Sequence, residues 1–285
     1  MIGQTRATLL MLLILCVLVV AFPNVEIVNA EGIIYIRPDG IVEGTDKIQR
    51  AGNVYTLTEN ISSTVNVQRS DIVIDGAGFA INVDGSHGID LTHGVGVGQN
   101  PSNLLYNVTI QNLFMAKESV IANGGGNHTV YNNYILRVYL YGCGYNKITH
   151  CTLDGINLDY GSNNNIVTEN NIRDAVEYLS YNNTVDRNYW SNYLTKYPNA
   201  TEIGNTGIGN QPYVYWIVDI PSDMPLIYQD EHPLMKPVAI PLTNSSPSNN
   251  TPEFPSWTPL LIMIFAVVAL AVVCRRKLQS RGRSK

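Results

Sequence analysis

The sequence has few of the residues that would cross-link a small secreted fold or mark a nucleic-acid binder. It contains four cysteines in 285 residues, and only Cys143 and Cys151 lie outside the apolar ends of the chain. Two cysteines are too few for a disulfide framework. Residues 31–257 contain 11 Lys and Arg against 22 Asp and Glu, a formal charge of −11. We therefore expect no nucleic-acid partner, because a polyanion would be repelled, and folding must rely on an apolar core.

Long apolar runs are absent except at the two ends of the chain. At the start, Arg6 precedes an apolar run at 9–22, and Val28-Asn29-Ala30 has the small-x-small pattern of a signal peptidase site. We therefore expect a signal peptide at 1–30. An uncleaved anchor of the same orientation is the alternative.

At the other end, residues 259–274 carry no charge and are followed by Arg275, Arg276 and Lys277. This pattern predicts a transmembrane segment at 257–277, with a basic cytoplasmic tail at 278–285 and the folded part outside. A buried core helix is the alternative, but a Ser/Asn/Pro-rich linker at 242–256 and a cationic tail would not flank one. The expected location is therefore the cell surface, with the chain anchored in the membrane.

Seven Asn-x-Ser/Thr sequons occur, and an exported protein could be glycosylated at them. Each is weak alone, since Asn-rich sequence produces such matches by chance. They begin at Asn60, Asn107, Asn127, Asn182, Asn199, Asn244 and Asn249.

One phrase recurs with a period of 18 or 19 residues. It begins at Val130, Ile148, Val167 and Val185, and each copy has apolar residues at its first and sixth positions. The copies are short, rich in Val, Ile, Thr and Tyr, and separated by Asn and Gly turns, which is typical of a β-solenoid. We expect an all-β fold, a right-handed parallel β-helix with three short strands in each coil.

The fourth position of the phrase predicts a ladder of side chains. It is occupied by Asn133, Cys151, Asn170 and Asn188. A buried turn leaves backbone groups unpaired, so stacked side-chain amides could bond the coils above and below. Cys151 would tolerate burial but interrupt the amide ladder.

The expected domain organisation follows from the repeat. We place an N-terminal cap at 31–60, the coils at 61–190 and a closing segment at 191–241. A cap is needed because the first coil would otherwise expose a strand edge.

Several phrases carry a resemblance to a known family. They are DIVIDGAG at 71–78, NYWSNY at 188–193, GNTGIGNQPY at 204–213 and DEHPLMKP at 230–237. By these phrases, the segment 34–190 and the closing segment resemble archaeal surface proteins of the NosD-type right-handed β-helix family. In that family a run of aspartates near 204–213 could hold a hard cation, whereas here Glu202 is the one carboxylate, so we expect no calcium site.

A second resemblance concerns the C-terminal end. PEFP at 252–255, followed by the apolar run and the basic residues, resembles the PEF-CTERM sorting signal of archaea. The resemblance implies a sorting enzyme that cuts near 252–255 and transfers the folded part to a lipid or another carrier. A plain membrane anchor is the alternative.

Two sets of residues are candidates for carbohydrate chemistry. Tyr141, Tyr160 and Tyr178 step by 19 and 18 residues. Facing outward they would form a row of rings about 4.8 Å apart, suited to stacking on sugars, and facing inward they would be a core stack. Asp159 and Glu177 lie 18 apart and would be coil neighbours, and carboxylates about 5 Å apart could serve retaining glycoside hydrolysis. A solvated polar face is the alternative reading of this pair.

The resemblance to the NosD type also raises the question of a copper site. No Cys-x-x-Cys or His-x-His pair occurs, so we expect neither a metal nor a cofactor. A disulfide between the two central cysteines stays an alternative, although half a coil separates them. The available ligands would be His128, His150, Cys143, Cys151 and Met115.

Together these patterns predict a membrane-anchored cell-surface β-helix that acts as a structural or polysaccharide-binding module. One alternative is an extracellular polysaccharide hydrolase or lyase, whose groove could also use Asp154 and Asp174. The other is a NosD-like copper-handling protein. Fold alone does not decide among them.

Overall fold

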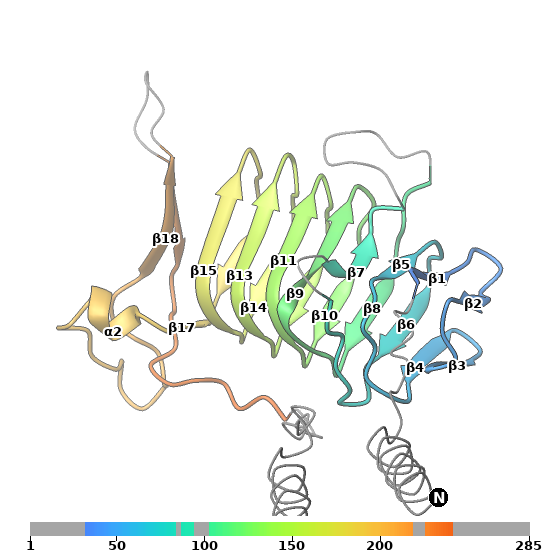
Figure 1. Cartoon of the computed structure of the whole chain (residues 1–285). Helices are drawn as coiled ribbons and strands as arrows, with labels where there is room; N and C mark the ends of the chain where they lie inside the picture. The colour runs from blue at the N-terminus through green and yellow to red at the C-terminus, as the bar shows by residue number, and fades with distance from the viewer. Residues whose placement is uncertain (1–31, 84–86, 94–102, 219–225, 242–285) are drawn as a thin grey trace, which may run out of the picture. The chain divides into compact units, whose positions relative to one another are not determined.

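The computed structural model describes residues 32–83, 87–93, 103–218 and 226–241 (Figure 1). The expected signal peptide, linker, sorting motif, transmembrane segment and tail, with Asn244 and Asn249, lie outside these residues. Within the described ranges, no helix is long and apolar enough to cross a membrane.

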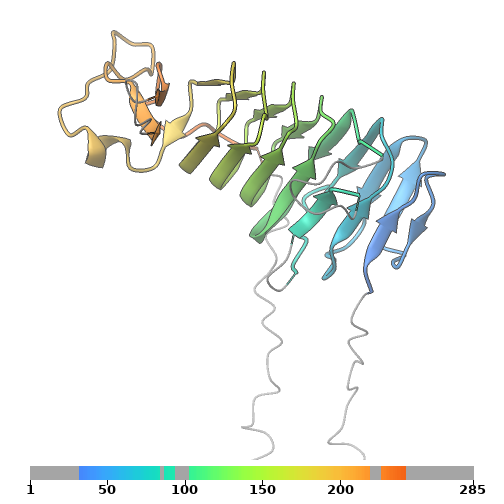
Figure 2. The ribbon, with the colours of Figure 1, turned by 90° about the horizontal axis from the view of Figure 1, so that it is seen from above.

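The described residues form a right-handed parallel β-helix of about six turns. Two sheets run along the stack of coils, and the chain passes from one to the other in each coil (Figures 1 and 2). The long-strand sheet contains β1 (Ile34–Ile36), β5 (Val65–Val67), β7 (His87–Leu91), β9 (Phe114–Asn123), β11 (Tyr134–Tyr141), β13 (Thr152–Asp159), β15 (Asn171–Tyr178) and β17 (Tyr189–Trp190), with β2 (Val42–Glu43) antiparallel at its edge. The short-strand sheet contains β4 (Val54–Leu57), β6 (Ile72–Asp75), β8 (Val108–Gln111), β10 (Thr129–Tyr131), β12 (Lys147–Thr149), β14 (Ile166–Thr168) and β16 (Thr184–Asp186), with β3 (Ile48–Ala51) antiparallel at its edge.

Each regular coil has two strands rather than the three expected from the sequence. In β11 the alternation of buried and less buried side chains breaks at Leu136 and Arg137, where the strand bends. Pairing with β13 nevertheless runs from Tyr134 to Tyr141. A bent strand keeps its backbone groups paired with neighbouring coils, so two expected strands merge into one.

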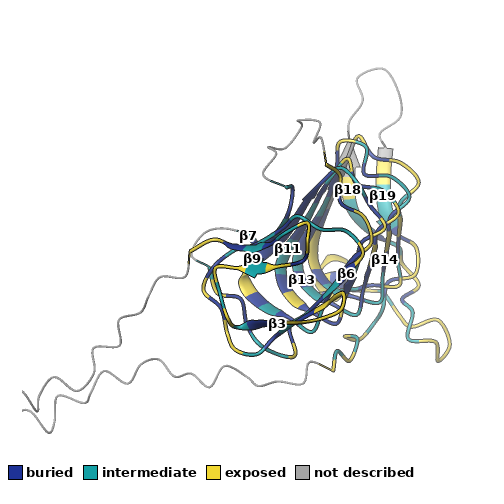
Figure 3. Ribbon diagram, turned by 90° about the vertical axis from the view of Figure 1, so that its right-hand side faces the viewer, coloured by how far each residue is buried: buried dark blue, intermediate teal, exposed yellow. Residues whose placement is uncertain are grey.

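The core is a set of apolar columns enclosed between the sheets. Figure 3 looks along the stack, with β9, β11 and β13 on one side and β6 and β14 on the other. Burying each such side chain contributes about 1.5–3 kcal/mol. One column of the long-strand sheet is Met115, Ile135, Leu153, Ile172 and Trp190, and one of the short-strand sheet is Ile110, Val130, Ile148, Val167 and Val185.

The coils turn at corners where one residue has a positive φ and the next is buried. At the corner before the long strands, the positive-φ residues are Asn132, His150, Glu169 and Arg187, with φ between 52° and 57°. Asn tolerates this conformation better than most residues. The residue that follows each of them is Asn133, Cys151, Asn170 or Asn188.

The two ends of the stack are closed differently. At the N-terminal end, β1–β2 and β3–β4 are antiparallel hairpins whose inner strands pair with the first coils. At the C-terminal end, α2 (Tyr193–Lys196) is followed by the antiparallel hairpin of β18 (Tyr213–Val218) and β19 (Leu226–Asp230). Trp190 stacks on Tyr213 with ring centroids 4.4 Å apart, so this end is covered by aromatic packing.

Residues 234–241, the return segment, run back beside the long-strand sheet (orange in Figure 1). Leu234 bridges to Tyr189, and the Asn171 side chain exchanges two hydrogen bonds with the backbone of Val238, at 2.8 and 3.0 Å. Farther along, Asn132 Nδ2 donates to the Pro241 carbonyl at 3.3 Å. The described chain therefore ends beside a central coil and not at the C-terminal end of the stack.

Candidate ligand-binding face

The four residues proposed as a ladder lie one above another and are fully buried. The backbone N–H of Cys151 donates to Asn170 Oδ1 at 2.9 Å, and that of Asn170 donates to Asn188 Oδ1 at 3.1 Å. Cys151 keeps part of the pattern, because its thiol lies 3.4 Å from the Thr149 carbonyl and 3.5 Å from that of Val130. These polar groups are satisfied within the protein, so the ladder is structural.

Sequence reasoning missed a second ladder at the corner before the short strands. His128, Asn146, Asn165 and Asn183 repeat with the same 18- and 19-residue steps, which was the available signal. The backbone N–H of His128 donates to Asn146 Oδ1 at 2.8 Å, and that of Asn146 donates to Asn165 Oδ1 at 2.9 Å. Burial lowers the pKa of His128 to about 4, so its imidazole is neutral at physiological pH.

The cysteines are buried and unlinked. Cys143 and Cys151 are both free thiols. Burial raises the pKa of each to about 12, so neither is a thiolate nucleophile near neutral pH. In the part of the chain that the structure describes, no three His, Cys, Asp or Glu side chains gather as a possible metal site.

The strand register separates the three tyrosines proposed as one row. Tyr141 pairs with Asp159, and Asp159 pairs with Tyr178, while Tyr160 follows β13 at φ 53°. The expected row fails because the 19-residue coil has its extra residue here. Two residues, 160 and 161, separate Asp159 from Ser162, whereas one residue occupies this turn in the coils before and after.

The same register also separates the backbones of the proposed carboxylate pair, Asp159 and Glu177. The backbone of Glu177 lies opposite Leu158 and not opposite Asp159. The other two acids are held in ion pairs between coils. Asp154 pairs with Arg173 at 2.7 Å, and Asp174 pairs with Arg137 at 3.3 Å.

A different aromatic arrangement is present on the outer face of the long-strand sheet. His87, Tyr139, Tyr141 and Tyr160 form a connected series, which we call the aromatic line. Successive ring centroids lie 6.0, 6.1 and 6.1 Å apart. Sequence reasoning missed Tyr139, although two tyrosines separated by one residue share a strand face. His87 could not be assigned, because its contact with Tyr139 spans coils of irregular length.

Polar groups lie beside the aromatic line. The Arg137 guanidinium lies across Gly155, where an added Cβ would collide with Arg137 Cζ. The guanidinium donates to Asn157 Oδ1 at 2.8 Å. Asn157 Nδ2 donates to Asp159 Oδ2 at 3.4 Å. Gly155 thus leaves room for the Arg137 guanidinium, which reaches across the coil of Gly155 to bond Asp174 in the coil beyond it.

Asp159 is the unusual member of this face. It is 8% exposed, and its Oδ1 is buried with no hydrogen-bond partner in the part of the chain that the structure describes. Burial raises the pKa of Asp159, and burial followed by the charge of Asp159 raises the pKa of Tyr141. An acceptor left unpaired in a buried position costs about 1–3 kcal/mol, which a ligand donor could recover.

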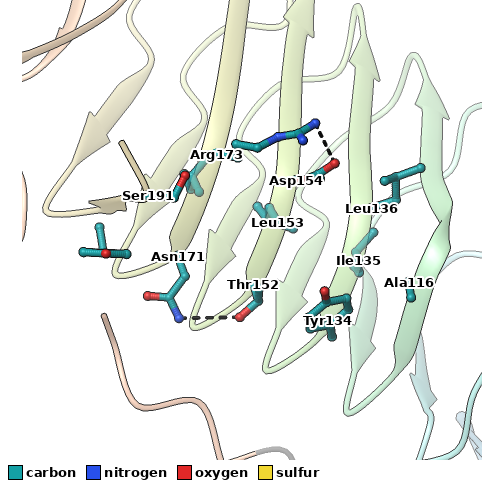
Figure 4. A pocket seen from close by; sticks show the side chains of 12 residues that line it. Ala116, Tyr134, Ile135, Leu136, Thr152, Leu153, Asp154, Asn171, Arg173 and Ser191 are labelled. Carbon is teal, nitrogen blue, oxygen red and sulfur yellow. Dashed lines mark hydrogen bonds and ion pairs between the residues drawn. The ribbon is translucent and has the colours of Figure 1, made fainter. Parts of the chain in front are cut away.

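A groove of about 310 Å³ lies on the other half of the same sheet (Figure 4). Tyr134 and Tyr189 belong to its lining, and the ion pair of Arg173 with Asp154 crosses between coils inside it. Its polar groups already bond one another, including Asn171 with Thr152 at 3.5 Å. We therefore regard the aromatic line as the stronger candidate site.

The five described sequon asparagines are all exposed. Three of them, Asn107, Asn127 and Asn182, occupy the same positive-φ corner of different coils. There the fold itself favours Asn at the turn, and Thr follows two residues later in the short strand. Structural repetition therefore accounts for these three matches without glycosylation. The remaining two are Asn60 and Asn199.

Comparison with protein-family models, with curated proteins and with solved structures found no match to this chain. The parallel β-solenoid is compatible with a β-helix family, but no match supports the NosD type, an archaeal source or a PEF-CTERM signal.

Proposed function

We propose that this protein is a membrane-anchored cell-surface β-helix that binds polysaccharide along the aromatic line. The main support for this proposal is the series of ring contacts from His87 through Tyr139 and Tyr141 to Tyr160. Aromatic rings pack well on the apolar faces of sugars, while the neighbouring guanidinium, amide and carboxyl groups offer hydrogen bonds to hydroxyls. The series crosses coils from His87 to Tyr139 and from Tyr141 to Tyr160, with one step along β11, so it could contact several units of an elongated ligand.

Surface placement rests on the two ends of the sequence. The apolar run before residue 30 supports export, and the apolar run before Arg275 supports anchoring. The likeness of 252–255 to a sorting signal adds a possible processing enzyme as a partner. Mass spectrometry of the membrane-extracted protein tests this placement, because it reports whether the chain begins near residue 31 and where it ends.

The binding proposal is tested with the full chain in mild detergent on a panel of soluble oligosaccharides. Replacing Tyr139 and Tyr141 together by alanine should weaken binding by tenfold or more, because stacking on each ring is worth about 1 kcal/mol. Tyr131→Ala is the matched control, since Tyr131 is 39% exposed on the short-strand sheet. Equal losses in both variants, or no binding to any glycan by the wild type, would contradict the proposal.

A further inference from the structure

The aromatic line has an excess of unsatisfied hydrogen-bond acceptors. Among the described residues, Asn132 Oδ1 at a coil corner is a buried oxygen with no hydrogen-bond partner. On this face the same holds for two buried oxygens, Asp159 Oδ1 and Asn66 Oδ1, and for His87 Nδ1. Asn66 lies in the strand next to that of His87. Both oxygens are pure acceptors, so the ligand group that would satisfy them is a donor, such as a hydroxyl or an ammonium.

The charges on this face favour the same kind of ligand. Asp90, Asp159 and Asp174 lie on this part of the long-strand sheet, and the cation beside them, Arg137, is already paired with Asp174. Asp90 also accepts a hydrogen bond from Asn66 Nδ2 at 3.4 Å. An anionic polymer would meet unpaired negative charge here, whereas a neutral or cationic one would not.

We infer that the ligand of the aromatic line is a neutral or amine-bearing glycan, and that Asp159 selects it against uronate-containing polysaccharides. This inference rests on the proposed function. Asp159 receives a hydroxyl or ammonium hydrogen on Oδ1, the carboxylate oxygen to which no described residue donates a hydrogen bond. A carboxylate of the ligand brings a second acceptor and a second negative charge to the same place, and it binds more weakly.

Access to Oδ1 requires a side chain to turn aside, because the atom is buried in the free protein. Tyr160 follows Asp159 in the chain, is 59% exposed, and has its ring centroid 6.1 Å from that of Tyr141. Its position at the turn that holds the extra residue of the coil places it at the end of the aromatic line.

The experiment compares matched hexasaccharides on the full chain in detergent by calorimetry. The probes are cellohexaose, the N-acetylglucosamine hexamer, the glucosamine hexamer and hexagalacturonate. The neutral and amine-bearing probes should bind at least about tenfold more tightly than hexagalacturonate. Asp159→Asn should weaken their binding roughly tenfold and reduce the discrimination against hexagalacturonate, because it removes the charge and keeps the shape.

Asp154→Asn is the control, since Asp154 is a carboxylate of the same strand whose partner is Arg173. It should leave the discrimination unchanged. Equal or tighter binding of hexagalacturonate by the wild type would overturn this inference and leave glycan binding in place. An unchanged preference in Asp159→Asn would remove the role of Asp159, and silence with every probe would overturn the proposed function as well.

Discussion

The corners of the coils and the outer face of the long-strand sheet both place polar side chains in buried positions, with different results. At the first ladder, each amide accepts a backbone N–H and donates to backbone carbonyls, as Asn170 does toward Ile148 and Thr168 at 2.9 and 3.0 Å. On the outer face, Asp159 has an oxygen that nothing in the described structure bonds. The fully bonded amides of the first ladder stabilise the fold, while Asp159 on the face keeps an oxygen that a ligand could bond.

The largest effect should come from breaking the ladder. Asn170→Ala removes the acceptor for the Cys151 N–H and the donors to two carbonyls, all in a fully buried corner. We expect the free energy of unfolding to fall by about 3–5 kcal/mol, because several buried groups lose their partners. Urea denaturation measures it.

Asn157→Ala is the matched change on the outer face, where Asn157 bonds Arg137 and Asp159 in a partly buried position. We expect a loss of at most about 1 kcal/mol there. Similar losses at the two sites would contradict the distinction between corner and face.

The next effect concerns the carboxylate that ends the first ladder. Asp230 is fully buried and accepts hydrogen bonds from the backbone N–H of Asn188 at 2.9 Å and from Trp190 Nε1 at 2.9 Å. Burial outweighs these donors and raises the pKa of Asp230 to about 6. The folded protein therefore binds the proton more tightly than the unfolded chain.

The stability contributed by this group is complete below about pH 4 and is lost as the pH rises through about 6. The unfolding free energy should fall by about 2–3 kcal/mol between pH 4 and pH 7, relative to Asp230→Asn. Chemical denaturation across this range, with wild type and variant compared at each pH, isolates Asp230 from other groups such as the His232–Asp186 pair. Parallel pH profiles would show that Asp230 titrates outside this window.

The smallest expected change in stability comes from replacing the one cysteine of the first ladder. Cys151→Asn restores an amide between Asn133 and Asn170. The present thiol makes only a weak contact with Asn133 Nδ2, at 3.9 Å. We expect stabilisation by about 0.5–1.5 kcal/mol if the corner accepts the slightly larger side chain. Cys143→Ser is the control, because serines occupy the equivalent position of the next coils at Ser162 and Ser180. A destabilised Cys151→Asn would mean that the corner is shaped for sulfur.

Much of the fold could be predicted because the repeat is regular between Val130 and Trp190. Matched apolar residues 18 or 19 apart become neighbours in a stack, and Val130, Ile148, Val167 and Val185 do so through paired strands. The number of strands per coil could not be predicted, since the bend near Leu136 follows from how the sheet curves around its core.

The candidate site was less accessible to sequence reasoning. Tyr141 and Tyr160 were found, but placing them in one column assumed that the longer coil had its extra residue elsewhere. Because side chains alternate along a strand, a shift of one residue changes which neighbour each side chain meets. Asp159 therefore occupies the position expected for Tyr160, between the strands of Tyr141 and Tyr178.

The sequence by itself determined the coil period, the apolar columns and the first buried ladder, because these depend on residues that recur at constant intervals. Only the tertiary structure decided which residues meet where the interval changes. The turn at 160 and 161 placed Tyr160 in the aromatic line, and Asp230, 42 residues beyond Asn188 in the chain, completed the ladder. Contacts of that kind depend on how irregular segments fold back onto the stack, and no local period encodes them.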